Sequence, residues 1–310
     1  MGLQTYLNTV FTGAGTLNVK LTDQSSKLFI IESTGGVTNL SSLNPGALGM
    51  LTGTRVSVDP SSAAGFNTFL INKGELNIDQ NVDLDNINDA YNNAEFVSSK
   101  VTLDPGIIMT GNTDNKYAIA QKNIAGGSRA DIILNNNGGT IDLSGDDSLG
   151  IAADYGEITN SGVIKISGDN SIAILGANGS KIDNTGTIEI NSTGVGIYGI
   201  NLLSGVTVPY GDKTIEIEND GIITSNNTAG RSYGIYAGNL DTAVPITDSV
   251  IFLGSNSVVD MSNSTDGVGV FSKRSTVTLD GEIKVGKDGM GLYAENSEVE
   301  ITSLILDLKG

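Results

Sequence analysis

One phrase of residues recurs along this chain at a nearly fixed interval, and a repeat of this length restricts the possible folds more than any other feature of the sequence. In each copy, apolar residues alternate with polar ones on both sides of an Asn-x-Gly turn. The copies are Ile158-Thr-Asn160-Ser-Gly162-Val-Ile164-Lys-Ile166, Ile182-Asp-Asn184-Thr-Gly186-Thr-Ile188-Glu-Ile190, Ile217-Glu-Asn219-Asp-Gly221-Ile-Ile223 and Leu70-Ile-Asn72-Lys-Gly74-Glu-Leu76-Asn-Ile78.

The spacing of the copies defines the period. The last strand positions are Leu143, Ile166, Ile190, Ser225, Met261, Val285 and Leu308, with gaps of 23, 24, 35, 36, 24 and 23 residues. A second block follows in each period, with clear copies at Gly194-Val-Gly-Ile-Tyr198, Ser232-Tyr-Gly-Ile-Tyr236, Gly267-Val-Gly-Val-Phe271 and Gly289-Met-Gly-Leu-Tyr293, and weaker ones starting at Lys116, Ser148 and Ser171. Short alternating runs separated by turn residues predict one turn of a β-solenoid per period.

The expected architecture is all-β, a right-handed parallel β-helix with loop insertions. Strands this short cannot bury a face alone and must stack on equivalent strands in the next turn, and parallel crossovers are generally right-handed. Glycines are expected to supply positive φ at the corners. The inward side chains should be Ile164, Ile166, Ile188 and Ile190, with Lys165 and Glu189 facing outward.

Asparagines at one phase of the repeat have two interpretations. Asn160 and Asn184 could form a ladder of stacked amides from rung to rung, or they could reflect the ordinary preference of asparagine for turns. The spacing alone favours neither.

The repeat also predicts how the chain is divided. Residues 1–69 should form an N-terminal irregular solenoid or capping part, and residues 70–310 regular β-helix repeats with insertions at 79–100, 121–131, 199–213 and 237–248. Before residue 131, we expect Thr110 and Ile78 to continue the series of last strand positions that starts at Leu143. We expect residues 85–96 to form a helix with Asp85 as its N-cap. The sequence ends inside a strand, and since a bare parallel edge invites aggregation, we expect the natural protein to continue.

Composition excludes several function classes. The 17 basic and 35 acidic residues give a net charge of −18, which repels nucleic acid and anionic lipid headgroups. With no histidine and no cysteine, His-based catalysis and Cys-ligated zinc cannot be assembled. The sequence shows no signal peptide and no apolar run long enough to insert into a membrane. We expect a monomer without a cofactor, because a single solenoid closes its own core.

The Asn-x-Gly-x-Ile-x-Ile phrase followed by Gly-x-Gly-Ile-Tyr, in an acidic, cysteine-free chain, resembles the passenger region of fusobacterial type V autotransporter adhesins of the RadD-like family. The resemblance covers residues 110–310 well and the first 110 weakly. It implies a right-handed β-helix displayed at the cell surface and anchored through an outer-membrane barrel absent from this sequence. It further implies binding of bacterial or host receptors or glycans, and it transfers no binding residue to a numbered position.

Other functions have weaker support. A polysaccharide-acting enzyme on a β-helix would use paired carboxylates, and the chain offers Asp146-Asp147 and Asn77-Ile-Asp79 but lacks the Gly-His-Gly and Arg-x-Lys strings of polygalacturonases. Residues 83–89 carry oxygen ligands but break the calcium-loop pattern. We therefore expect a non-catalytic adhesive module without a metal site, with a passive stalk as the alternative.

The candidate binding residues lie in the two enlarged periods. Both insertions follow the Gly-Ile-Tyr block, so the loops should lie side by side on one flank of the solenoid, where they either bind a ligand or only cover the helix. A tyrosine there offers a ring face to a sugar or aromatic side chain. The candidates are Pro209, Tyr210, Asp212, Lys213, Asp241 and Pro245.

Overall fold

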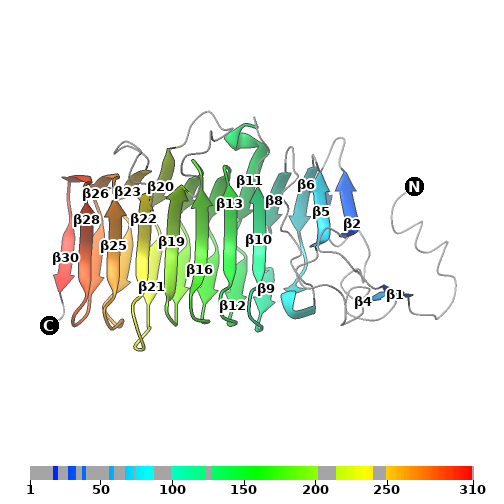
Figure 1. Cartoon of the computed structure of the whole chain (residues 1–310), viewed down its shortest axis with the longest axis horizontal. Helices are drawn as coiled ribbons and strands as arrows, with labels where there is room; N and C mark the ends of the chain where they lie inside the picture. Colours follow the sequence, from blue (N-terminus) through cyan, green and yellow to red (C-terminus); the bar gives the residue numbers. More distant parts are fainter. Residues whose placement is uncertain are drawn as a thin grey trace.

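The chain forms a parallel β-helix (Figure 1). The structure is a computed structural model that describes residues 17–19, 27–32, 37–39, 56–58, 67–72, 74–86, 99–122, 127–201, 214–239 and 249–308. Each regular turn of the solenoid, called a rung below, contributes one strand to each of three long sheets. The predicted all-β repeat architecture is thereby confirmed.

The first sheet has ten strands in the order β29-β26-β23-β20-β17-β14-β11-β8-β6-β3. Its parallel pairing puts Asn136 beside Asn160, and Asn160 beside Asn184. Its strands are β3 (Val37–Asn39), β6 (Gly74–Ile78), β8 (Ser99–Leu103), β11 (Ile132–Asn136), β14 (Glu157–Asn160), β17 (Lys181–Asn184), β20 (Ile215–Asn219), β23 (Ser249–Leu253), β26 (Thr276–Leu279) and β29 (Glu298–Ile301).

The second sheet has nine strands in the order β30-β27-β24-β21-β18-β15-β12-β9-β7. Its register aligns Leu143 with Ile166, Ile166 with Ile190, and Ile190 with Ser225, as the repeat predicts. Its strands are β7 (Val82–Asp83), β9 (Ile108–Gly111), β12 (Thr140–Leu143), β15 (Val163–Ile166), β18 (Thr187–Ile190), β21 (Ile222–Ser225), β24 (Val258–Met261), β27 (Glu282–Val285) and β30 (Ile305–Leu308).

The third sheet has seven strands in the order β10-β13-β16-β19-β22-β25-β28, formed by the second block of each period. Its strands are β10 (Tyr117–Lys122), β13 (Leu149–Asp154), β16 (Ser171–Ala177), β19 (Gly194–Asn201), β22 (Tyr233–Asn239), β25 (Val268–Lys273) and β28 (Met290–Glu295). Two further sheets have two strands each: β1 (Leu17–Val19) pairs with β4 (Val56–Val58), and β2 (Lys27–Glu32) pairs with β5 (Asn67–Asn72). The described residues also form two 3-10 helices, η1 (Leu84–Asn86) and η2 (Arg129–Asp131).

The core is a stack of aliphatic side chains between the three sheets. The four isoleucines expected to point inward, Ile164, Ile166, Ile188 and Ile190, are at most 1% exposed. Lys165 and Glu189 point outward from β15 and β18 and form an ion pair of 3.4 Å between Nζ and Oε2. Alternation along strands such as β15 and β18 therefore separates the core from the surface, as the period-two pattern predicts.

A buried ladder of amides runs alongside the apolar core. The Nδ2 of Asn136 donates to Oδ1 of Asn160 at 2.8 Å, and Asn160 donates to Asn184 at 2.7 Å. Asn184 donates to Asn219 at 2.6 Å, and Asn219 donates to the hydroxyl of Ser257 at 2.5 Å. The ladder interpretation of Asn160 and Asn184 is confirmed, because these side chains satisfy one another inside the solenoid.

The expectation that glycine supplies positive φ at the corners holds only in part: Gly106, Gly138 and Gly179 have φ of 76°, 85° and 89°. Among the described residues, nine that are not glycine have φ between 50° and 61°, and they flank the seven-stranded sheet at both of its corners, including Asp147 and Asn170 before it and Asn178 after it. At the Asn-x-Gly turn the glycines serve a different purpose. A Cβ on Gly186 would lie 2.2 Å from the carbonyl oxygen of Gly162, so stacked turns leave no room for a side chain.

The register upstream of residue 130 also differs from the prediction. Gly74–Ile78 pairs with Ser99–Leu103 in the ten-stranded sheet, so Ile78 aligns with Leu103 rather than with the strand ends of the nine-stranded sheet. Thr110 is displaced by one position, because Gly111 is the partner of Leu143. At Ile78 the Asn72-Lys-Gly74 phrase is intact, but the strand that follows it lies in the ten-stranded sheet, whereas in the later copies that strand lies in the nine-stranded sheet. Before Thr110, Asp104-Pro-Gly106 stands in place of the phrase, so only the apolar alternation was left to set the position.

The predicted helix over residues 85–96 is wrong at its start. Asp85 lies inside η1, and its carboxylate accepts hydrogen bonds of 2.9 Å from the backbone N–H groups of Asn112 and Thr113 in the next rung. Residues 87–96 lie outside the described part of the chain.

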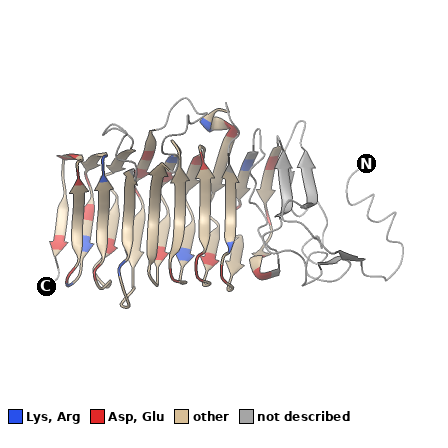
Figure 2. Cartoon of the chain, in the orientation of Figure 1, with Lys and Arg blue, Asp and Glu red and all other residues tan. Residues whose placement is uncertain are grey.

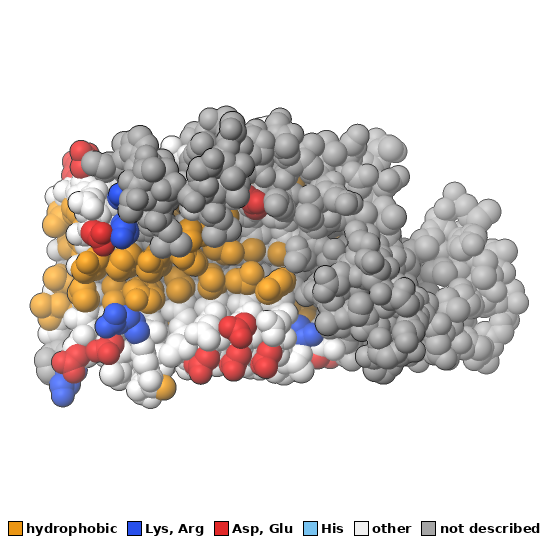
Figure 3. Space-filling model, in the orientation of Figure 1, with side chains coloured by type: hydrophobic (Ala, Val, Ile, Leu, Met, Phe, Trp, Pro, Cys, Tyr) orange, Lys and Arg blue, Asp and Glu red, His pale blue; other side chains and the backbone are white. Residues whose placement is uncertain are grey.

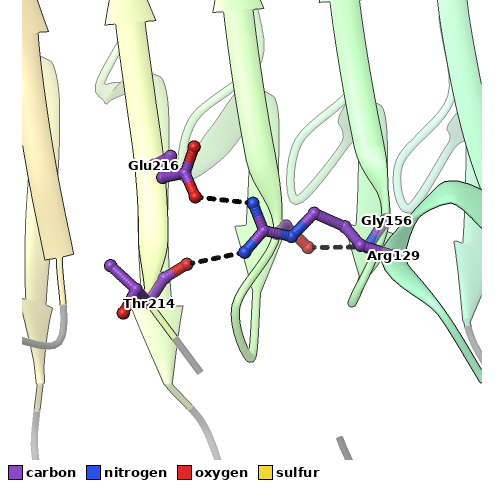
Figure 4. Close-up of polar contacts among 5 residues, drawn as sticks. Arg129, Gly156, Thr214 and Glu216 are labelled. Carbon is purple, nitrogen blue, oxygen red and sulfur yellow. Dashed lines mark hydrogen bonds and ion pairs between the residues drawn. The ribbon is translucent and has the colours of Figure 1, made fainter. Parts of the chain in front are cut away.

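A polar strap crosses the edge of the ten-stranded sheet. Arg129, in η2 just before β11, reaches past β14 and β17 to β20 (Figure 4). Its Nη1 donates to Oε1 of Glu216 at 2.7 Å, and its Nη2 donates to the carbonyl oxygen of Thr214 at 3.4 Å. The strap therefore ties rungs that lie 87 residues apart in the sequence.

Candidate functional site

The sequence-predicted binding residues lie outside the described part of the chain. Pro209, Tyr210, Asp212 and Lys213 belong to residues 202–213, and Asp241 and Pro245 to residues 240–248. The described strands β19 and β22 lead directly into these two segments, since they end at Asn201 and Asn239. Asn201 and Asn239 are themselves register partners on neighbouring strands, so the two strands end at equivalent positions. That the loops lie side by side stays a prediction.

The described chain carries one long apolar surface, on the outer face of the seven-stranded sheet. Figure 3 shows it as an orange band along the solenoid, and Figure 2 shows few charged residues on these strands between their turns. We call it the apolar stripe. It consists of two register columns: Tyr117, Leu149, Ile172, Val195, Tyr233, Val268 and Met290, and Ala120, Ala152, Leu175, Tyr198, Tyr236, Phe271 and Tyr293.

A small residue in each strand creates the spacing of these columns. On β19, Val195 and Tyr198 are half-buried on the outer face, whereas Ile197 between them is buried in the core. Two residues that are three apart share this face because Gly196 and Ile197 between them are both buried and the pairing of β16 with β19 skips Gly196. A Cβ at Gly196 would lie 2.6 Å from the carbonyl oxygen of Gly234. The Gly-x-Gly motif therefore shapes this surface.

The second column becomes aromatic over its last four strands. We call Tyr198, Tyr236, Phe271 and Tyr293 the aromatic ladder. The rings of Tyr236 and Phe271 are stacked, with centroids 4.4 Å apart and planes within 8°, and those of Phe271 and Tyr293 with centroids 4.9 Å apart and planes within 10°. Tyr198 meets Tyr236 edge to face at 5.0 Å. Such contacts hold the rings in fixed positions.

The ladder is uncharged. Burial raises the pKa of Tyr198 above its usual value of 10.0, and the nearby Tyr236 raises it further. Burial likewise raises the pKa of Tyr236, together with the neighbouring Tyr233. Both phenols therefore keep their protons at neutral pH and add no charge to the stripe.

Acidic turns border the first three strands of the stripe. We call Asp114, Asp146, Asp147 and Asp169 the acidic turn row; all four are exposed, in the turns that precede β10, β13 and β16. Oδ1 of Asp114 accepts a hydrogen bond of 3.0 Å from the backbone N–H of Asp146, and Oδ1 of Asp146 accepts one of 2.7 Å from that of Asp169. The carboxylates are thus held in a line from rung to rung.

Asp169 continues this row toward β19. Its carboxylate accepts hydrogen bonds from the hydroxyls of Ser192 and Thr193 and from the backbone N–H of Thr193. These hydrogen bonds lower the pKa of Asp169 below its usual value of 3.8. The carboxylate is therefore ionised over the whole physiological range.

The carboxylates considered for chemistry occupy structural positions. Asp146 and Asp147 form an exposed turn, with Asp147 at a φ of 54°. Nδ2 of Asn77 donates to Oδ2 of Asp104 at 2.9 Å, and Asp83 accepts a hydrogen bond of 3.0 Å from the backbone N–H of Asp85. Asn88 and Asp89 lie outside the described ranges.

Two further observations concern the described residues only. They contain no group of three or more acidic side chains placed to hold a metal ion. Neither of the two short helices among them has the length and apolarity that a membrane-spanning helix needs.

The aromatic ladder was missed by the sequence analysis. The signal was present, because Tyr198, Tyr236, Phe271 and Tyr293 end the four clear copies of the second block. Those residues served only to define the period, whereas one aromatic residue at the same phase of four consecutive rungs already predicts a column of rings on one face.

Comparisons with known proteins add no family. Neither a scan against protein-family models nor searches of curated proteins and of solved structures find a match to this chain.

Proposed function

We propose that the chain is a non-catalytic binding module, the displayed β-helix of a surface adhesin that binds host-cell or bacterial-surface receptors. The observation that carries this proposal is the apolar stripe, which presents aromatic and aliphatic side chains on a rigid sheet. In this stripe Met290 and Tyr293 are exposed, Ala120, Ala152 and Val268 are buried, and the other side chains are half-buried. Contiguous apolar patches on a protein surface usually mark interaction sites. We also propose that the chain is displayed at the cell surface through an outer-membrane barrel, because its repeats resemble those of fusobacterial autotransporter passengers.

The acidic composition and the absence of histidine and cysteine support a binding role over catalysis. The carboxylates of Asp114, Asp146 and Asp169 accept hydrogen bonds from the next rung. These acids therefore have a structural use, whereas a glycan-cleaving enzyme needs a pair of carboxylates for catalysis.

The test is a binding screen with the chain alone on glycan arrays and on bacterial and human cells. We expect saturable binding to at least one cell type, without release of products from any bound glycan. Release of shortened glycan would favour a polysaccharide-acting enzyme instead. A folded chain that binds no cell and no glycan would favour the passive stalk.

The predicted loop site needs a separate variant. Tyr210→Ala combined with Asp241→Ala should weaken adhesion if these side chains contact the receptor. Unchanged adhesion of a folded double variant would place the site elsewhere on the solenoid.

A further inference from the structure

We propose that the apolar stripe and the acidic turn row together bind a protein partner, through an amphipathic helix whose apolar face is flanked on one side by lysine or arginine. This inference rests on the proposed binding function and names the class of partner.

The orientation of the rings separates protein from glycan. Phe271 is stacked between Tyr236 and Tyr293, so both of its faces are covered by neighbouring rings. Tyr198 meets Tyr236 at 83°. A sugar packs on an open ring face, and neither face of Phe271 is open, whereas the ring edges and the aliphatic side chains of the stripe suit apolar side chains of a protein.

The first three strands of the stripe favour the same class of partner. Their outward side chains include Leu149, Ile172 and Leu175, and Ala120 and Ala152 occupy the same column as Leu175. None of these side chains can donate or accept a hydrogen bond. A hydroxyl-rich ligand would lose its water there without compensation, whereas an apolar helix face would gain from burial.

The border of the stripe supplies the charge complementarity. Beside β10, β13 and β16 lie the four exposed carboxylates of the acidic turn row. Hydrogen bonds from the next rung fix Asp114, Asp146 and Asp169 in line, and no charged side chain interrupts the two columns of the stripe. A partner with basic residues along one side of its apolar face would pair with this row, which would set its orientation and speed its association.

The length of the stripe fits a helix. Seven strands at about 4.8 Å spacing extend roughly 29 Å, which is the length of a helix of about 20 residues. Because both columns run straight along the solenoid, a helix lying parallel to its axis would contact every rung of the stripe.

The experiment uses the full chain and three synthetic helical peptides. The first has a face of leucine and phenylalanine flanked by lysines, the second carries glutamates in place of the lysines, and the third has serines in place of the apolar face. We expect the lysine peptide to bind at least about tenfold more tightly than either of the others, and its affinity to fall as salt is raised.

Two sets of variants locate the contact. Tyr236→Ala with Phe271→Ala should weaken binding of the lysine peptide by about tenfold or more. Asp146→Asn with Asp147→Asn should weaken binding of the lysine peptide several-fold and reduce its salt dependence. Asparagine keeps an oxygen that can accept a hydrogen bond at position 146 and tolerates the positive φ at position 147, so the fold is retained. The matched control is Phe252→Ala, because this phenylalanine is 38% exposed on the ten-stranded sheet.

Several outcomes would overturn the inference. They are equal binding of the lysine and glutamate peptides, no binding of either, or unchanged binding in the two variant sets. The variants are also tested on cells. If the wild-type chain and the Tyr236→Ala, Phe271→Ala variant adhere equally, the inference fails while the adhesive function stands; if the wild-type chain adheres to nothing, the proposed function itself fails.

Discussion

Asn184 stands in the middle of the buried amide ladder, where it accepts from Asn160 and donates to Asn219. Asn184→Ala would leave one donor and one acceptor without partners in the core, and each such group costs about 1–3 kcal/mol. We expect a clear drop of the urea midpoint. The matched control is Asn191→Ala, because Asn191 makes its amide hydrogen bonds on the exposed surface; equal effects of the two substitutions would contradict a structural role for the ladder.

Asp85 makes stability depend on pH. Partial burial would raise its pKa, but hydrogen bonds from Thr113 and Asn112 outweigh this and lower the pKa below 3.8. Because the folded pKa lies below the unfolded one, the carboxylate stabilises the fold above pH 3.8, and this contribution is lost as the pH falls through the folded pKa.

Replacement of Asp85 by asparagine tests this. Between the wild type and Asp85→Asn, the difference in unfolding free energy should be largest near neutral pH and shrink below pH 3.8. Asp142→Asn, at an outward strand position, is the control. A difference that stays constant with pH would show that the charge of Asp85 contributes nothing.

At the scale of single elements, the Asn-x-Gly turn between β17 and β18 leaves no room for a side chain on its glycine. A Cβ at position 186 would lie 2.2 Å from the carbonyl oxygen of Gly162 and 2.8 Å from Nδ2 of Asn160. Gly186→Ala must therefore displace the stacked backbone or the ladder, and we expect it to cost about 3 kcal/mol or more. The adjacent exposed Thr185→Ala should change the unfolding free energy by much less, and a similar midpoint for both variants would contradict the steric argument.

The strap formed by Arg129 connects two elements, η2 and β20. The Arg129 side chain is 15% exposed and the Glu216 side chain 40%, so solvent screens the pair and a coupling of about 1 kcal/mol is the most we expect. A double-mutant cycle with Arg129→Ala and Glu216→Ala measures it. Hydrogen exchange of residues 127–131 should speed up in both variants, and no change there would mean that the strap does not hold η2.

From about residue 131 onward, the sequence was sufficient to assign the described strands to their sheets; before that residue it was not. Ile164, Ile188 and the second-block residues fall where the period places them, because a repeated pattern averages out the ambiguity of any single strand. Ile78 was placed in the wrong sheet, since one apolar strand has no neighbouring copies to fix its phase. The ring stacking of Phe271 depends on packing between rungs, which spacing alone does not specify.

For the whole molecule, stability should vary along the solenoid. Apart from the Arg129 strap, the strands of each rung pair with those of the adjacent rungs, so in this chain the inner rungs have two paired neighbours and the rung of β29 and β30 has one. The side chains of Ile305, Leu306 and Leu308 on β30 are 48–64% exposed, whereas Ile188 and Ile190 are fully buried. Amide hydrogen exchange should be slowest in β14–β21 and fastest in β29 and β30. Uniform protection across all rungs would contradict this one-dimensional behaviour.

The far-ultraviolet circular dichroism spectrum should show β structure with little helix. A helix content above about one third would be incompatible with a solenoid of short strands.

The regular register also makes rungs interchangeable units. Val163 and Thr187 occupy equivalent places on neighbouring strands, as do Asn160 and Asn184, which are 24 residues apart. Joining Gly162 directly to Thr187 would remove one complete turn and bring Asn160 opposite Asn219. Asn160 could then donate to Asn219 as Asn184 does now, so the amide ladder would stay continuous in the shorter molecule. A deletion of half a period would instead align the apolar residues of one rung with the turn residues of the next. Natural variation in the length of such a protein should therefore come in whole periods, with other changes confined to the segments between strands.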